Sequence, residues 1–500
     1  MTKERHKPLD SLNALALAAV GFGIVVRIAQ FISNRSLWGD EAWLALNVID
    51  RSYQGLLQPL DHNQAAPVGF LWLQKLAVQL FGDSEYAHRL FPLIAGVVSV
   101  IAIYKLGKGV VSALALPIAV ALFACLKYPL YYATEAKPYS SDVMVALLLS
   151  LLLIPLRAKQ LSKGQRLLAG FAGGVTVWVS YPAIFVLTGL EVIGFILSPG
   201  KQPLARLINR SPVYLTWVVS FLASYLLVTA KVASNQGLQS AWNDEYPKSI
   251  FDLLWLLDSL GRFFYHPLGF LNGMDGVAIV AFILGCLALL KRDREKLFIL
   301  FAPIAVTLMA GYLHKYHFRA RLVLFLTPFF ILIIAEGVAF LLSQFKQRPI
   351  LGVLGLVMTG LLLFPPLTRA TQLIVDPEKK QELRPVIEYI KSHQRAADQI
   401  YVDYGAVLQF SYYAPKFNLA ASDYIHGDQN LVESDTFSKQ QWQEFAQLSG
   451  RLQPGQRVWF VFSGLNHRKE QALPPRLAQI GEKIDSFKQP GVSTYLYKLR

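Results

Sequence analysis

Two adjacent carboxylates, Asp40 and Glu41, stand just after the first long apolar stretch of the chain. An ionised acid beside an apolar boundary is costly unless it has partners, and partial desolvation moves a carboxyl group towards the range of a general base. The simpler interpretation is that Asp40 caps a helix that begins near Glu41. Neighbouring helical side chains point in different directions, so the two carboxylates need not share one role.

Two further segments near apolar boundaries carry polar side chains. Residues 61–67 contain His62, and the alternatives there are a site that orients a phosphate, a metal or a sugar, and an ordinary turn closed by proline. Glu135 and Lys137 lie between tyrosines at the edge of a later apolar stretch. Interfacial tyrosines are common, but a Glu and a Lys so close to hydrocarbon are less so.

A third segment begins a late apolar stretch with several cations. His317, Arg319 and Arg321 lie there on the side where short loops are otherwise poor in positive charge. This cluster is the best anion-binding candidate in the chain. The simpler alternative is that these side chains reach out to lipid head groups.

A carboxylate facing such cations suits substitution at a sugar carbon with a lipid phosphate as the leaving group. The base takes a proton from the acceptor hydroxyl, and the departing phosphate needs positive charge rather than a general acid. A hydrolytic glycosidase would instead need two carboxylates that flank the bond. We therefore hypothesise transfer from a lipid phosphate, with these groups in the two roles: Asp40 as the base, and Lys137, His317, Arg319 and Arg321 as the cations.

Composition indicates where such residues must sit. The chain has 500 residues, of which 54% are hydrophobic and 16% charged, against about 25% charged in a typical soluble domain. Charge-poor stretches recur from Leu12 to about Leu367. The net charge of +15 comes largely from short loops between these stretches, which favours the positive-inside rule over a nucleic-acid partner. Cys125 and Cys286 both fall in apolar stretches and are expected to be inert thiols.

The sequence predicts a polytopic α-helical membrane protein with about eleven spans. The first is expected to be an uncleaved helix, with the N-terminus in the cytoplasm and the C-terminus outside. Each span is an apolar stretch of a length that can cross hydrocarbon about 30 Å thick. The predicted spans are 12–32, 91–107, 110–127, 139–156, 167–180, 182–198, 213–233, 274–290, 297–313, 322–342 and 350–367.

Two domains are predicted, a transmembrane catalytic domain of residues 1–367 and an outer α/β domain of residues 368–500. The first outer loop, 33–90, contains an apolar segment at 71–78 that should lie in the interface plane as a helix. Another outer loop, about 234–273, carries Asp244, Glu245, Asp258 and His266. In the outer domain we expect strands at 399–402, 457–462 and 493–497, and helices near Leu383–Ile390 and near Trp442.

These features together resemble the GT-C superfamily of membrane glycosyltransferases, which includes protein O-mannosyltransferases and aminoarabinose transferases. The resemblance extends over about residues 1–340. It is carried, in the family's order, by Arg27, by residues 37–42 with the acidic pair, by His62 with Pro67, by residues 88–92, by residues 132–139 and by residues 321–328.

The resemblance implies a polyprenyl-phosphate-linked sugar as the donor and inversion at the anomeric carbon, with Asp40 as the base. It implies that Glu41 supports the loop or the acceptor site, and that His62, Glu135 and Lys137 bind the donor head. Some relatives place a divalent metal near the donor phosphate and others do not need one. Lys137 stands where the family often has arginine, and Leu322 replaces a usual tyrosine, which leaves both Arg319 and Arg321 open as the phosphate ligand.

Other functions remain as alternatives. A lipid-linked-glycan transporter or flippase would be expected to show internal repeats and charges at the membrane midplane, and we find neither in the sequence. A polysaccharide polymerase or ligase would typically lack the early acidic pair, and a non-catalytic assembly factor would use its tail to bind a partner. The preferred location is a bacterial inner membrane with the site facing outward. The sugar, and whether the acceptor is a lipid, a glycan or a protein, are not identified.

Overall fold

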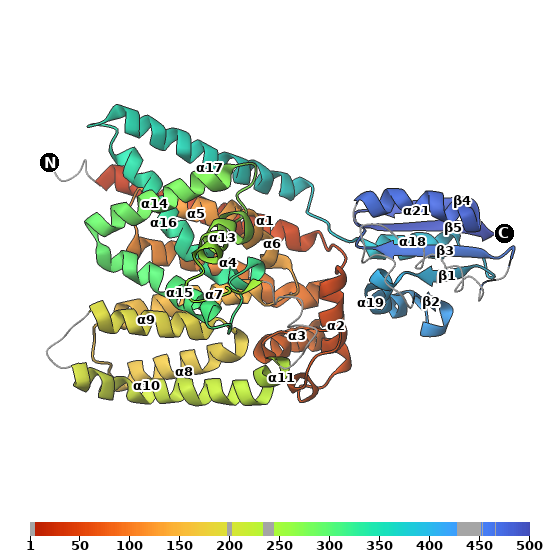
Figure 1. The fold of residues 1–500 in the computed structure, drawn as a ribbon, viewed down its shortest axis with the longest axis horizontal. Coiled ribbons are helices and arrows are strands. Elements are labelled where there is room, and N and C mark those ends of the chain that lie inside the picture. The colour runs from red at the N-terminus through yellow and green to blue at the C-terminus, as the bar shows by residue number, and fades with distance from the viewer. Residues whose placement is uncertain (1–5, 198–202, 234–244, 428–451, 453, 466) are drawn as a thin grey trace. The chain divides into compact units, whose positions relative to one another are not determined.

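The computed structural model describes residues 6–197, 203–233, 245–427, 452, 454–465 and 467–500 (Figure 1). The chain divides into two compact units. The first consists of Met1–Ser33 and Arg51–Pro377, and the second of Asn34–Asp50 and Glu378–Arg500. The first unit is helical, and the second is built on a five-stranded sheet.

The long helices of the first unit follow the apolar stretches of the sequence. Glycine allows the helix that contains Gly285 and the helix that contains Gly337 to pack in direct contact. A Cβ atom at either glycine would lie 1.9 Å from a carbonyl oxygen of the opposite helix. The helices are α1 (His6–Ile32), α3 (Val68–Phe81), α4 (Glu85–Val110), α5 (Ala115–Cys125), α6 (Lys127–Tyr131), α7 (Tyr139–Leu153), α8 (Lys163–Val179), α9 (Ala183–Leu197), α10 (Pro203–Ser224), α11 (Ala230–Ala233), α13 (Leu253–Phe263), α14 (Met274–Arg292), α15 (Arg294–Tyr312), α16 (Thr327–Ser343) and α17 (Pro349–Val375).

The predicted membrane character of this unit is confirmed, but the count of eleven spans is not. Among the described residues, eight stretches are long and apolar enough to cross a membrane, or nine if one bent pair is a single span. A helix occurs at every predicted position. However, α8 and α9 have 17 and 15 residues, fewer than the roughly 20 that a straight crossing needs. The helix predicted at 71–78 is present as α3, and its interfacial position stays a prediction.

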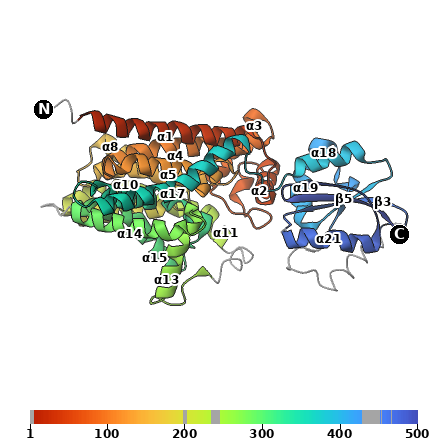
Figure 2. The ribbon, with the colours of Figure 1, turned by 90° about the horizontal axis from the view of Figure 1, so that it is seen from above.

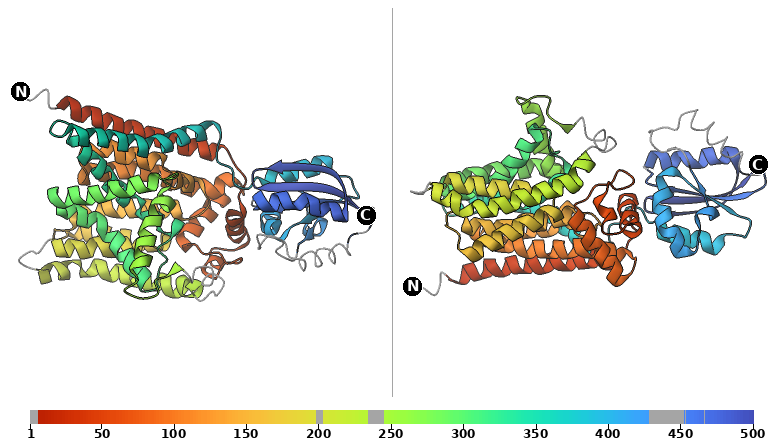
Figure 3. Two further views of the ribbon diagram at one scale, coloured as in Figure 1. Left: turned by 45° about the horizontal axis from the view of Figure 1, so that its top comes forward. Right: turned by 90° about the horizontal axis from the view of Figure 1, so that it is seen from below.

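Helices α1 and α17 run side by side in the same direction, red and teal in Figure 3. Their C-terminal ends meet where Gln30 Nε2 donates a hydrogen bond to the carbonyl of Leu373 at 2.8 Å. Successive membrane spans alternate in direction. Because α1 and α17 run in the same direction, the number of crossings from α1 to α17, with both included, must be odd. Nine and eleven crossings both satisfy this condition.

A break between α5 and α6 shapes the region where several site residues lie. The two helical pieces meet at 59°, because Leu126 has an extended backbone with φ −59° and ψ 142°. A helix end leaves carbonyls without helical donors, and lipid cannot supply them. The buried Arg27 of α1 supplies donors instead. Its guanidinium donates to the carbonyls of Gly23 (3.0 Å), Ala124 (3.2 Å), Phe123 (3.3 Å) and Pro129 (3.4 Å).

The second unit is an α/β fold, as predicted. Its sheet has the order β2-β1-β3-β5-β4, in which β1 is parallel to β2 and β3 while β5 is antiparallel to β3 and β4. The elements are α18 (Leu383–His393), β1 (Gln399–Val402), α19 (Tyr404–Tyr413), β2 (Ile425–His426), β3 (Arg457–Ser463), α21 (His467–Ile480), β4 (Gly481–Gln489) and β5 (Val492–Leu499). The three predicted strands and the helix near Leu383 are confirmed, whereas the helix predicted near Trp442 lies outside the described residues.

Alternation of side chains along the strands gives the sheet two apolar faces. One face packs Val402, Trp459 and Leu496 with residues of α18 and α19, and the other packs Phe460 and Tyr497 with α21. Figure 2 shows α18 and α21 on opposite sides of the strands.

One element of the second unit comes from far away in the sequence. Helix α2 (Gly39–Asp50) follows the first long helix, yet Leu37, Ala42 and Ala45 are fully buried in the same core as Leu383 and Phe410. The predicted division at 367/368 assigned residues 34–50 to the first domain. It missed their place in the second unit because the partners of α2 are more than 300 residues distant in the sequence. The last helix of the first unit also continues past residue 367, to Val375.

We predict that Arg27→Leu lowers stability by on the order of 3 kcal/mol, because it leaves buried carbonyls without donors. The measurement is the melting temperature of the purified protein in detergent. Arg294→Leu, which changes an exposed arginine at the start of α15, is the matched control. Equal melting temperatures for the two variants would show that the break does not depend on Arg27.

Candidate active site

The acidic pair lies in the first turn of α2, in the second unit. The carbonyl of Trp38 accepts hydrogen bonds from the backbone of Glu41 and Ala42, both at 2.9 Å, so Asp40 lies inside the helix rather than at its cap. The Glu41 carboxylate reaches back and accepts from the Trp38 backbone N–H at 3.2 Å. Glu41 is fully buried and Asp40 is half-buried. Glu41 therefore supports the loop, and the interpretation of Asp40 as a helix cap is wrong.

Glu135 and Lys137 lie in the first unit, in the short connection between the turn that ends at Thr134 and helix α7. Both side chains are buried, with exposed fractions of 0% and 3%. Lys137 Nζ donates to Gln64 Oε1 at 2.5 Å, and Gln64 Nε2 donates to the carbonyl of His62 at 3.4 Å. The structure therefore places Lys137 in contact with the segment 61–67. This contact is required if Lys137 and that segment belong to one donor-head site.

His62 itself lies on a turn. Its φ of +62° and the φ of +51° at Asn63 are left-handed conformations that a tight turn uses. The turn is anchored on either side, by an ion pair between Asp61 and Arg51 at 2.7 Å and by a hydrogen bond from Tyr181 to the carbonyl of Ala66 at 2.9 Å. The His62 side chain is exposed, and it is the His62 backbone that contacts Gln64.

The late cluster of cations divides into two parts. Arg319 is paired with two carboxylates, those of Glu245 and Asp258, the latter at 3.1 Å. His317 Nε2 lies 3.2 Å from the hydroxyl of Tyr246, and burial lowers the pKa of His317. Arg319 and His317 thus hold the segment around residues 245–258. The predicted Asp244 lies outside the described residues.

Arg321 has different neighbours. Its guanidinium lies 5.4 Å from the ring centre of Tyr139, and it acts electrostatically on the hydroxyl of Tyr132. Glu135 acts on the same hydroxyl, so Arg321 and Glu135 share one neighbourhood of the first unit. The rings of Tyr132 and Tyr139 stand edge to face at 5.1 Å. Arg321 therefore lies among the tyrosines and Glu135 of the first unit.

Two further basic residues, Lys127 and His266, lie close to Arg321. Lys127 was assigned to the end of a span, and His266 to an outer loop. His266 packs against Tyr128 with 3.8 Å between ring centres, and a Cβ atom at Gly269, where φ is +95°, would lie 2.7 Å from Lys127. Burial, followed by the charges of Arg321 and Lys127, lowers the pKa of His266 from 6.5 to about 4. No sequence pattern joins residues 127 and 266, because only the helix break and this glycine bring them together.

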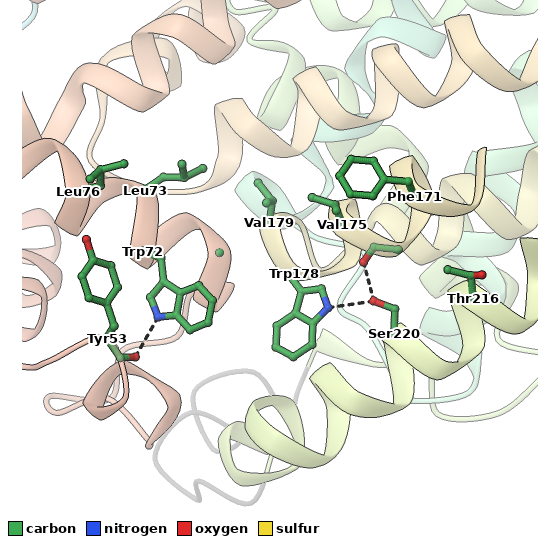
Figure 4. A pocket seen from close by; sticks show the side chains of 12 residues that line it. Tyr53, Trp72, Leu73, Leu76, Phe171, Val175, Trp178, Val179, Thr216 and Ser220 are labelled. Atoms are coloured by element: carbon green, nitrogen blue, oxygen red, sulfur yellow. Dashed lines mark hydrogen bonds between the residues drawn. The ribbon is translucent and has the colours of Figure 1, made fainter. Parts of the chain in front are cut away.

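An apolar groove of about 780 Å³ lies between α3, α8 and α10 (Figure 4). Trp72 and Trp178 line it, and their indole N–H groups donate to the carbonyl of Tyr53 and to Ser220 Oγ, both at 2.9 Å. The remaining surface can therefore accept hydrocarbon without leaving a donor unpaired. Gly69 and Val179, which also line the groove, are close in sequence to the joined pair Ala66 and Tyr181. The groove is therefore connected through the chain to the segment that contains Gln64.

No three His, Cys, Asp or Glu side chains come together as a metal-binding group within the described ranges. Glu135, the acidic member of the predicted donor-head site in the first unit, lies beside Lys137 and Tyr132 rather than beside other metal ligands. A divalent metal near the donor phosphate stays a prediction, and we derive no step through it.

Comparison with known proteins confirms the predicted resemblance to the GT-C glycosyltransferases. A model of the dolichyl-phosphate-mannose-protein mannosyltransferase family matches residues 65–229, the part that contains Glu135 and Lys137. No curated protein sequence matches the chain.

Solved structures share the fold over nearly the whole chain. ArnT from Cupriavidus metallidurans bound to undecaprenyl phosphate is 13% identical, with a TM-score of 0.53 over 95% of this chain and 97% of that chain. The Archaeoglobus fulgidus oligosaccharyltransferase in complex with zinc and sulfate is 11% identical, with a TM-score of 0.54 over 96% of this chain and 72% of that chain. The oligosaccharyltransferase AglB from Archaeoglobus fulgidus, in complex with an inhibitory peptide and a dolichol-phosphate, is 11% identical, with a TM-score of 0.50 over 96% of this chain and 74% of that chain.

We predict that His266 makes stability sensitive to pH. Because its pKa is depressed in the folded protein, the unfolded chain binds more protons between pH 6.5 and about 4, and stability is lost as the pH falls through that window. His266→Phe keeps an aromatic ring without a titrating group. Its melting temperature should fall less than that of the wild type, by a few degrees, between pH 7.5 and 5. The exposed His393, which stacks on Tyr389, supplies the control His393→Phe. Identical pH profiles for the wild type and His266→Phe would contradict the assignment.

Proposed function

We propose that this protein is a glycosyltransferase that moves a sugar from a polyprenyl-phosphate carrier to an acceptor hydroxyl on the outer side of the membrane. The observation that carries the proposal is the pair of cations, Lys137 and Arg321, in one unit of a chain with the GT-C fold. Lys137 is two residues from Tyr139, whose ring lies 5.4 Å from Arg321. Solved structures of this fold hold undecaprenyl phosphate and dolichol-phosphate, which supports a lipid phosphate as the ligand.

The proposed reaction is a single displacement. Asp40 takes the proton of the acceptor hydroxyl as its oxygen forms a bond to the anomeric carbon. The bond from that carbon to the phosphate oxygen breaks, and the electron pair leaves with the polyprenyl phosphate. Attack from the face opposite the leaving group inverts the anomeric centre. The leaving phosphate is already an anion, so cations near it stabilise the transition state without transferring a proton.

The ion pairs of the late cluster favour Arg321 over Arg319 as the phosphate ligand. Arg319 is neutralised by Glu245 and Asp258, and bringing a phosphate to it would require breaking those pairs. In this proposal Arg321, whose guanidinium lies 5.4 Å from the ring centre of Tyr139, binds the phosphate. Lys137 supplies the second positive charge, as a point charge rather than a bidentate fork.

In this proposal the polyprenyl chain lies in the apolar groove between α3, α8 and α10. The groove is lined by Trp72, Trp178 and Phe171, and two of its lining residues, Gly69 and Val179, are close in sequence to Ala66 and Tyr181, which join the segment of Gln64. The lipid would then place its phosphate beside the cations while its chain stays in hydrocarbon. The positive-inside distribution of the short loops supports an outward-facing site, and a bacterial inner membrane is the proposed location.

The first test is the release of polyprenyl phosphate from a panel of polyprenyl-phosphate sugars by the protein in lipid. We predict that Asp40→Asn lowers this rate about 100-fold or more, the contribution of a positioned base. Asp50→Asn, at the exposed end of the same helix, is the matched control and should keep the wild-type rate. Full activity of folded Asp40→Asn would place the base elsewhere. If no donor is consumed by the wild type, a lipid-flipping assay would test the transporter alternative.

The second test compares the two arginines. Arg321→Gln should lower kcat/KM for the donor about 100-fold, the scale for loss of one charge-stabilising donor. Arg319→Gln should change kcat/KM less than about threefold, but it should lower the melting temperature because it removes the ion pairs that Arg319 forms with Glu245 and Asp258. The opposite pattern would make Arg319 the phosphate ligand.

A further inference from the structure

The segment that leads into Asp40 has no regular structure of its own. Residues 34–38 form neither helix nor strand, so their backbone groups need other partners. Side chains of the second unit supply them. The contacts are Arg384 Nη2 to Asn34 O (2.8 Å), Ser36 N to Glu382 Oε1 (3.1 Å), Leu37 N to Tyr413 Oη (2.7 Å), Gln409 Nε2 to Leu37 O (2.7 Å) and Gly39 N to Gln381 Oε1 (2.8 Å).

These side chains lie at a particular place in the sheet. Strands β1 and β3 are parallel neighbours, and the chain leaves β1 through α19 towards β2 but leaves β3 through α21 towards β4. The two connections go in opposite directions. In open α/β sheets the crevice outside the carboxyl ends of such a strand pair is where ligands bind.

The second unit fills this crevice with its own N-terminal segment. Ser463, the last residue of β3, donates from Oγ to Gln409 Oε1 at 2.7 Å, and Gln409 in turn holds the carbonyl of Leu37. Gln409 also donates to the carbonyl of Gln381 at 3.1 Å, and a Cβ atom at Gly464 would lie 3.1 Å from Gln381 Nε2. The sheet therefore fixes Gln409 and Gln381, and through them the backbone before Asp40.

The anchors themselves are rigidly held. Glu382, Gln409 and Tyr413 are buried, with exposed fractions of 4%, 0% and 0%. The backbone N–H of Glu382 donates to the carbonyl of Pro490 at 2.9 Å, in the turn between β4 and β5. The acidic loop is thus attached to the carboxyl end of the sheet and to this turn.

We infer that the second unit is a holder for the acidic loop, and that Gln381, Gln409 and Tyr413 are positioning residues for the base. The inference rests on the proposed role of Asp40. The unit uses the crevice of its sheet to fix a catalytic backbone rather than to bind a separate ligand. Activity depends on this unit because it sets the direction of the first turn of α2.

The test removes one oxygen atom. Tyr413→Phe loses only the hydroxyl that accepts from the backbone of Leu37, and Tyr412→Phe is the matched control, because the hydroxyl of Tyr412 accepts from Lys416 Nζ at 2.7 Å instead. With the donor found in the panel, Tyr413→Phe should lower kcat about tenfold and leave the donor KM within about twofold, since the proposed phosphate ligands are in the other unit. Tyr412→Phe should change neither. An unchanged kcat in Tyr413→Phe, with Asp40→Asn inactive, would overturn the inference.

Hydrogen exchange of the full-length protein gives a readout that does not depend on the reaction. The amides of residues 36–39 should exchange about tenfold faster in Tyr413→Phe than in the wild type or in Tyr412→Phe. Equal protection in all three proteins would overturn the holding role. If Tyr413→Phe does not fold, Gln381→Met, which removes the acceptor for the Gly39 amide at a half-buried position, replaces it in both assays. If Asp40→Asn stays active but the exchange result holds, the proposed base fails while the holding role of the second unit stands.

Discussion

Backbone groups that leave regular structure inside a membrane must find partners within the protein, because hydrocarbon offers none. The break at Leu126 is such a place, and the guanidinium of Arg27 meets the requirement by binding carbonyls on both sides of it. The chain can then turn through 59° and continue as Lys127–Thr134. Tyr128, Tyr132 and the buried Glu135 and Lys137 follow from that turn. An arginine inside a first span, which composition alone would suggest is functional, has a structural task that makes the functional region possible.

Ion pairing decides the tasks of the two arginines in the late cluster. Arg319 is paired with Glu245 and Asp258 and so holds the segment 245–258, whereas Arg321 lies beside the ring of Tyr139. Two arginines separated by one residue therefore have different tasks. Their spacing in sequence gave no reason to separate them, and only the partners brought by a distant loop do so.

Much of the helical framework could be predicted from the sequence, because membrane spans are set by a local property, the length of an apolar stretch. The strands at Gln399, Arg457 and Val492 were also visible as short runs of β-branched and aromatic residues. The number of membrane spans was harder to predict, because α8 and α9 are apolar but shorter than a straight crossing needs. The sequence named Glu135 and Lys137 as candidates, and the structure buries both. It did not group Lys127 with His266 or Gln64 with Lys137, because pairings across 70 to 140 residues leave no pattern in the sequence. The placement of α2 in the core of the second unit was missed for the same reason.

That placement has a consequence for how the protein is made. Leu37 is bound by Tyr413, 376 residues later in the chain, and in the order of the sequence α2 comes between α1 and α3 of the other unit. At a synthesis rate of about 5–20 residues per second, the acidic helix waits on the order of 20–75 s for the strands and helices that bury its apolar side. During that time Leu37, Ala42 and Ala45 have no core to enter. The helix is the first part of its unit to be synthesised and among the last to reach its final environment, so completion of the tail acts as a timing step before the acidic loop can be ordered.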